Sequence, residues 1–164
     1  MWDEYWKEYY YVSADACYFD QYAVSSSRWN LIISSVCLLA SSSTVVLLLS
    51  STGPAEIWGI ILFLAQLVTV IRPAFPFEKR MIAANYIAKE LHLLETEMKN
   101  HILDFTEDTP DEIFMELIKD ARKRNEEIQF RFADSDTFPR KERFMEKAQN
   151  EAYLRLGGHK DERK

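Results

Sequence analysis

The sequence of 164 residues predicts an all-α protein, in which a two-helix transmembrane hairpin follows an N-terminal amphipathic helix and precedes a C-terminal cytoplasmic helical bundle or coiled coil. Three observations predict this class. Residues 29–55 and 57–71 contain no Asp, Glu, Lys or Arg. Apolar residues recur every seven positions in residues 77–105. No segment alternates polar and apolar residues over a length typical of strands.

The first predicted element, residues 1–28, interleaves aromatic residues with acidic ones. Their spacing predicts an amphipathic helix that continues into the first apolar stretch. Aromatic faces of this kind mostly pack against other helices, so we expect a packing face rather than a ligand site. The aromatic residues are Trp2, Tyr5, Trp6, Tyr9, Phe19 and Tyr22.

The next segment, residues 29–77, is predicted to form the transmembrane hairpin. A bilayer core about 30 Å thick is crossed by roughly 20 apolar helical residues, a length that the first apolar stretch meets easily. The second stretch is shorter but gains length from Trp58 and Phe75, which suit membrane interfaces. A Gly-Pro pair between them predicts a tight turn. Two core helices of a soluble protein are the alternative.

The placement of basic residues predicts the orientation of the hairpin. The turn between the two stretches has no Lys or Arg, whereas Arg28 precedes the first stretch and Arg72 and Lys79 follow the second. Because cytoplasmic flanks carry the excess of positive charge, we expect both termini in the cytoplasm.

Residues 78–108 are predicted to form a cytoplasmic amphipathic or coiled-coil helix. Its apolar residues follow a and d spacing over about four heptads, which indicates a seam that holds copies of the chain together. A soluble helix with a broader apolar face is the alternative. Pro73 and Pro76 lie just before this helix and are the predicted hinge. The seam residues are Ala84, Ile87, Leu91, Leu94 and Met98.

Residues 109–164 are predicted to be a helical region with a frayed tail. Thr109, Pro110 and Glu112 fit a capping box with a proline start, which predicts a helix. A last helix over residues 141–156 is expected to stop at two glycines. The apolar side of the first of these helices is predicted to be Ile113, Leu117, Ala121 and Ile128.

Small polar residues form a stripe on the first predicted span, because they step by four and three residues and so share one face of a helix. Their hydroxyls could bond across a close helix contact, or several hairpins could turn this face to a water-filled lumen. Gln66 is a further polar group, and Glu56 would form a ring at the mouth of a symmetric pore, which would favour cations. The stripe consists of Asn30, Ser34, Cys37, Ser41 and Thr44.

Several classes of function are disfavoured by the sequence. The net charge of −6 argues against a nucleic-acid partner. No catalytic constellation or cofactor motif is present, so we expect no enzyme and no cofactor. Glu97 and His101 lie one helical turn apart, but a metal site needs more than two ligands, so none is expected. His92 and His159 are interpreted as surface residues, and the two cysteines as thiols outside any disulfide.

The order of these parts resembles the bacterial SLATT proteins, two-transmembrane effectors of conflict and antiphage systems. The resemblance covers Tyr5 to Phe105: an aromatic helix, the serine-rich span, a minimal turn, a second span ending "LVTVIRPAF", and the helix "EKRMIAANYIAKELHLLETEMKN". It implies an effector in the bacterial inner membrane, thought to form pores when a partner signals. No catalytic residues transfer with it.

The sequence therefore leads to two hypotheses about function. In the first, a homo-oligomer in the lipid bilayer forms a regulated pore that disrupts the inner membrane, triggered by a partner protein or a nucleotide-signal component of a defence system. In the second, the chain is a membrane-anchored scaffold or regulatory subunit that recruits a soluble partner and conducts no ions.

Overall fold

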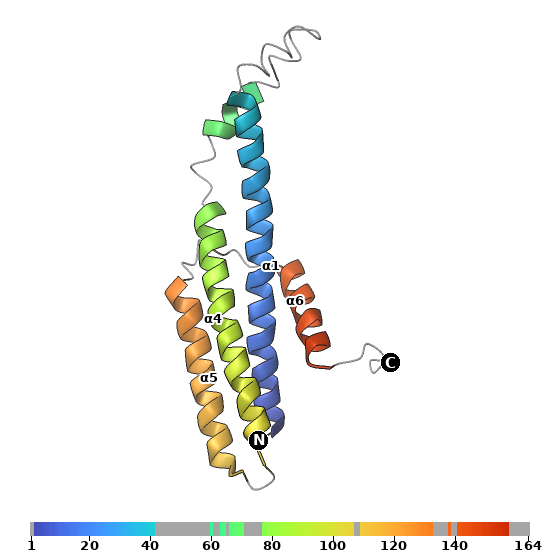
Figure 1. Cartoon of the computed structure of the whole chain (residues 1–164), viewed down its shortest axis with the longest axis vertical. Helices are drawn as coiled ribbons and strands as arrows, with labels where there is room; N and C mark the ends of the chain where they lie inside the picture. The colour runs from blue at the N-terminus through green and yellow to red at the C-terminus, as the bar shows by residue number, and fades with distance from the viewer. Residues whose placement is uncertain are drawn as a thin grey trace. The chain divides into compact units, whose positions relative to one another are not determined.

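A computed structural model describes residues 2–41, 60, 63–64, 66–70, 77–106, 109–132, 138 and 141–157. Four helices are bounded within these ranges, and none of these residues forms a strand, so the all-α prediction is confirmed for them (Figure 1). The helices are α1 (Trp2–Ser41), α4 (Phe77–Asp104), α5 (Asp111–Phe132) and α6 (Glu142–Arg155).

The chain divides into two compact units. The first combines Met1–Val24 with Arg80–Lys164, and the second is Ser25–Lys79. Two helices contribute to both units: α1 is a single helix without a break at residue 25, and α4 begins three residues before the boundary. We refer to the first unit as the bundle unit and to the second as the apolar unit.

In the bundle unit the four helices lie side by side (Figure 1). Side-chain contacts give their register. Tyr5 on α1 contacts Met98 on α4, and Ser13 contacts Glu95, so these two helices run antiparallel. The α6 helix begins against α1, because the backbone N–H of its N-cap, Lys141, donates to the Tyr18 hydroxyl at 3.2 Å.

Two neighbouring clusters of buried side chains form the core of the bundle unit, and the partly buried Ile128 packs against both. Burying one large apolar side chain stabilises a fold by roughly 1.5–3 kcal/mol, so the clusters account for much of the stability of this unit. One cluster contains Tyr5, Tyr9, Val12, Leu94, Met98, Phe114, Ile118 and Ala121. The other contains Ala16, Cys17, Tyr18, Phe19, Tyr22, Ala23, Ala84, Ile87, Ala88, Leu91 and Ala148.

The aromatic face of α1 is a packing face, as the sequence predicts. Tyr5, Tyr9 and Tyr22 are buried, and their rings meet others edge to face. Phe105, just after α4, lies with its ring centroid 4.4 Å from that of Phe114 on α5 and 5.2 Å from that of Tyr5. Aromatic pairs of this kind add about 0.5–1.5 kcal/mol beyond the area that they bury.

The predicted seam on α4 is buried, but its partners belong to the same chain. All five seam residues are at most 2% exposed and pack in the two clusters described above. Side chains already covered by α1 and its neighbours cannot also line an interface between copies in this structure. In this structure the residues with heptad spacing pack against other helices of the same chain. This differs from the sequence-based prediction, in which they form a seam between copies of the chain. The residues concerned are Ala84, Ile87, Leu91, Leu94 and Met98.

The C-terminal helices depart from prediction in detail. On α5 the predicted Ala121 is buried, and the predicted Leu117 and Ile128 pack against the core. The predicted Ile113 is 45% exposed, and Phe114 and Ile118 are buried although the sequence did not single them out. The helix α6 ends as predicted. Gly157 follows its C-cap with a φ of 81°, a left-handed conformation that glycine adopts without the steric cost of a Cβ.

Much of the predicted hairpin lies outside the described residues, including all of residues 42–59 and 71–76. Among the residues that are described, no helix combines the length and the apolar character needed to cross a bilayer.

Candidate functional site

The three described residues of the predicted stripe whose burial is known lie on the covered side of α1 in the apolar unit. Asn30 and Ser34 are half-buried, and Cys37 is only 6% exposed. The Thr69 hydroxyl donates to Cys37 Sγ at 3.5 Å, which joins α1 to residues 66–70 within this unit. The structure thus brings together part of the stripe and a polar residue of the second predicted span.

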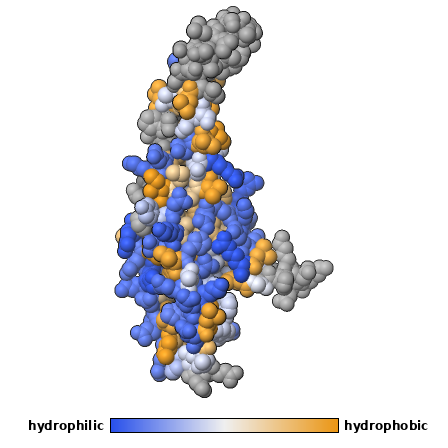
Figure 2. Space-filling model, viewed as in Figure 1, coloured by the Kyte–Doolittle hydropathy of each residue, from blue (hydrophilic) through white to orange (hydrophobic). Residues whose placement is uncertain are grey.

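The other side of this segment exposes large aliphatic and aromatic side chains. Leu38 is 73% exposed, and Val70 is 76% exposed. Figure 2 shows apolar side chains gathered at the surface beside the residues drawn in grey. The exposed apolar residues of the unit are Trp29, Leu31, Ile32, Val36, Leu38, Ile60, Phe63, Leu64, Leu67 and Val70.

Over residues 30–38 of α1, the small polar Asn30, Ser34 and Cys37 are covered while the large apolar side chains named above are exposed, which is the reverse of the distribution expected in water. Soluble helices turn apolar side chains inward and small polar ones outward. Helices in lipid approach each other through Ser, Thr, Gly and Ala, because hydrocarbon solvates their aliphatic side chains as well as another helix would. An exposed apolar surface of this kind marks a contact with lipid or with another protein.

Of the remaining predicted residues, Gln66 is exposed. Ser41 is the last residue of α1. Thr44, Glu56, Pro73 and Pro76 lie outside the described residues, so the predictions about the pore mouth and the hinge fall there as well.

In the bundle unit, acidic residues of α1 are bound by polar side chains of α5. The Arg122 Nε–H donates to the Glu8 carboxylate at 2.7 Å, although Glu8 is only 6% exposed. Asp15 accepts hydrogen bonds from Asn125 at 3.1 Å and from Gln129 at 2.9 Å. Burial raises the pKa of Asp15 above its usual range, against the lowering effect of the two amide bonds.

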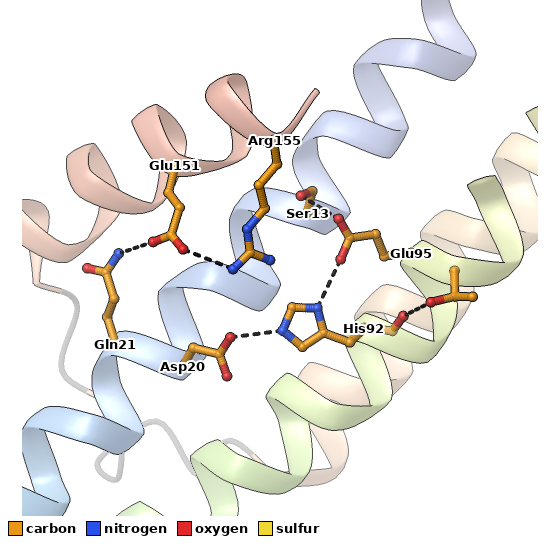
Figure 3. Close-up of polar contacts among 8 residues, drawn as sticks. Ser13, Asp20, Gln21, His92, Glu95, Glu151 and Arg155 are labelled. Atoms are coloured by element: carbon orange, nitrogen blue, oxygen red, sulfur yellow. Dashed lines mark hydrogen bonds and ion pairs between the residues drawn. The ribbon is translucent and has the colours of Figure 1, made fainter. Parts of the chain in front are cut away.

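Two further polar groups lie near each other in the bundle unit: the His92 cluster, which joins α1 and α4, and a group that joins α1 and α6 (Figure 3). His92 Nε2 lies 2.8 Å from the Asp20 carboxylate, and His92 Nδ1 lies 2.9 Å from the Glu95 carboxylate. The Ser13 hydroxyl donates to Glu95 at 2.7 Å. On α6, Arg155 donates to Glu151 at 2.9 Å, and Glu151 also accepts from Gln21 of α1 at 3.3 Å.

His92 is therefore not the plain surface residue that the sequence suggests, because only 35% of its side chain is exposed and both ring nitrogens have partners. Glu95 lies one turn along the same helix and could have been noticed from that spacing. Asp20 lies 72 residues away, and no local pattern connects it with His92. Only the antiparallel register of α1 and α4 brings these two side chains together.

Glu97, one member of the metal pair considered above, is held by Arg124 of α5. The two terminal nitrogens of the guanidinium, Nη1 and Nη2, each donate a hydrogen bond to the Glu97 carboxylate. These hydrogen bonds lower the pKa of Glu97. Within the described ranges no three His, Cys, Asp or Glu side chains are grouped as metal ligands would be.

The two cysteines, both among the described residues, are buried and form no disulfide. Cys17 lies in the core of the bundle unit, where burial raises the pKa of its thiol to about 11, with Arg155 opposing the rise. A thiol with this pKa is almost entirely protonated at neutral pH and is a poor nucleophile.

No protein-family model, curated protein or solved structure matches this chain significantly.

Proposed function

We propose that this protein is a membrane effector of a bacterial antiphage or conflict system, resembling the SLATT proteins. In this proposal residues 29–77 form a hairpin in the inner membrane and both termini lie in the cytoplasm. Several copies assemble, and the hairpins open a pore when a partner protein or a nucleotide signal acts on the bundle unit.

The observation that carries the proposal is the reversed polarity of the apolar unit. Each large apolar side chain left in water forgoes roughly 1.5–3 kcal/mol relative to burial. Ten such residues are exposed in the described part of this unit, so the surface needs an apolar environment. Lipid provides one on every side, and the small polar face then remains available for helix contacts.

The contact between Cys37 and Thr69 suits a closed resting state. The Thr69 hydroxyl donates to Cys37 Sγ at 3.5 Å, so these two groups face each other and not a water-filled lumen. For a pore to conduct, this contact must break and the stripe must become hydrated. Pro73 and Pro76 remain the proposed hinge for that movement.

A membrane-anchored scaffold is the second candidate, and the same contact favours it. If Asn30, Ser34 and Cys37 serve only to pack the hairpin, no ion crosses and the bundle unit recruits a soluble partner. The intrachain burial of the α4 seam also removes the surface that the sequence offered for assembly.

Two neighbouring serines separate these candidates. Ser34 is half-buried on the small polar face, whereas Ser35 is exposed on the other side. We expect overproduced wild-type protein to depolarise cells loaded with a membrane-potential dye. Ser34→Leu should weaken the effect, because leucine narrows and dries the lumen, whereas Ser35→Leu should leave it intact.

A Ser41→Leu/Thr44→Leu double variant should act like Ser34→Leu, because both residues belong to the predicted stripe. Protein levels in the membrane fraction, and the mass of the assembly in detergent, must match wild type in each case. Absence of depolarisation by the wild type, with normal insertion, would favour the scaffold. A single-copy mass in detergent would rule out a pore made of hairpins from several chains.

A further inference from the structure

Both ring nitrogens of His92 face carboxylates that belong to different helices. Asp20 on α1 lies 2.8 Å from Nε2, and Glu95 on α4 lies 2.9 Å from Nδ1 (Figure 3). A neutral imidazole has one N–H donor and one bare nitrogen that can only accept. An ionised carboxylate is also only an acceptor. Both contacts can therefore be hydrogen bonds only when the ring carries two protons.

The surroundings of His92 favour this charged form. Asp20 and Glu95 contact it directly, and the nearby Arg155 of α6 is paired with Glu151 (Figure 3). Cys17 of α1, which is buried nearby, is neutral at physiological pH. Burial by itself lowers the pKa of His92, but the hydrogen bonds and charges of Asp20 and Glu95 outweigh burial and raise it above its usual value.

The position of the pair in the chain gives the contact a role. The helices α1 and α4 are the two that continue from the bundle unit into the apolar unit. The contact from Asp20 to His92 is an ion pair that connects these two helices directly. A change in its strength therefore acts on both chain segments that link the units.

We propose that His92 is a pH-sensitive clamp, which holds α1 to α4 while its ring is protonated and releases Asp20 or Glu95 when the ring loses a proton. Deprotonation leaves one nitrogen lone pair facing a carboxylate, which is repulsive. Because the pKa is raised on folding, the stabilisation is complete below the unfolded value of 6.5 and is lost as the pH rises through the folded value. A rise in pH thus loosens the bundle unit. This inference does not depend on the proposed function.

Titration of the full-length chain in mild detergent tests the protonation state directly. With ¹³C-labelled histidine, the ring resonances are followed by NMR from about pH 5 to about pH 9, and the His92 signal is assigned by its loss in His92→Gln. We expect its midpoint to lie above 6.5 and to move down in Asp20→Asn. A midpoint at or below 6.5, or one that Asp20→Asn leaves unchanged, would overturn the proposal.

Stability measurements test the clamp itself. The folded-to-unfolded ratio of the wild type, obtained from urea unfolding, should fall several-fold between about pH 6 and about pH 8.5. In His92→Gln this dependence should flatten, whereas His101→Gln, on the same helix, should retain it. Asp20→Asn provides a second test if His92→Gln does not fold, since it should weaken the dependence as well. Equal pH dependence in the wild type and both cluster variants would contradict the clamp.

Discussion

At the scale of single residues, α1 carries acidic groups that depend on partners far away in the sequence. Glu8 is buried and is bound by Arg122, whose own side chain is 60% exposed. A carboxylate in this position is tolerated only because the guanidinium compensates for the water that it has lost. The aromatic residues around it were predictable from their spacing, but this ion pair was not, because 114 residues separate its members.

We predict that Arg122→Ala destabilises the protein by about 1–2 kcal/mol. The cost arises because Glu8 stays buried without its hydrogen-bond donor. It is limited because the Arg122 side chain is mostly exposed, so water already screens its charge. Lys123→Ala is the matched control. Lys123 pairs with Glu127 at 3.9 Å on the exposed face of the same helix, and its loss should change stability by less than about 0.5 kcal/mol. Urea unfolding measures both variants, and equal losses would contradict the role of Glu8.

The Cys17 thiol provides a second prediction at this scale. Burial raises its pKa to about 11, so few thiolate ions form at pH 8 and the sulfur is also shielded. In a Cys37→Ala background, iodoacetamide should label Cys17 only as fast as the bundle unit opens, and labelling should become rapid in denaturant. Mass spectrometry over time measures this rate. Rapid labelling of the native chain would show that the core around Cys17 is open.

At the scale of elements, the sequence predicted where helices begin and end more accurately than which helices pack against each other. The limits of the expected ranges 78–108 and 141–156 lie within four residues of those of α4 and α6, because proline and glycine signals act locally. On α5 the sequence identified Ala121 but named Ile113 in place of Phe114, since Phe114 packs against Phe105 and Tyr5, which lie elsewhere in the chain. Heptad spacing likewise identified the buried side of α4 but could not indicate which helix covers it.

Two leucines of α4 test this assignment. Leu91 is fully buried, whereas Leu93 is 51% exposed. Leu91→Ala should cost about 2–5 kcal/mol by leaving a cavity, and Leu93→Ala should cost less than about 0.5 kcal/mol. Thermal or urea unfolding gives the difference. The mass of the assembly in detergent should be unchanged by Leu93→Ala. If Leu91→Ala dissociated the assembly while each chain stayed folded, the α4 seam would lie between copies of the chain, as the sequence predicts.

At the scale of the whole molecule, the two units differ in where their large apolar side chains lie. The bundle unit packs aromatic and aliphatic side chains into two core clusters, although it also exposes some, such as Phe130, whereas the described part of the apolar unit exposes ten. The stripe of small polar residues was predictable from helical periodicity. Its contact with residue 69 was not, because that depends on how the second predicted span lies against the first.

An acidic substitution distinguishes lipid from water as the environment of the apolar unit. If Leu38 faces hydrocarbon, Leu38→Asp should oppose insertion by up to about 2.5–3.5 kcal/mol. Leu93→Asp, on the exposed side of the bundle unit, should have little effect. Membrane pelleting and detergent extraction measure insertion, and reporters fused to each end should both be cytoplasmic. Normal pelleting of Leu38→Asp, or reporters in opposite compartments, would contradict the membrane hairpin.

The bundle unit is assembled from chain segments that are made at very different times. Tyr10 on α1 contacts the backbone of Gln149, which is synthesised 139 residues later. At roughly 5–20 residues per second, a ribosome needs on the order of ten seconds to make that partner available. The α4 residues that pack against the aromatic face of α1 are made sooner than Gln149, but still only after residues 42–76 have been synthesised. We therefore expect a newly made chain to be most prone to aggregation until α4 follows α1 out of the ribosome.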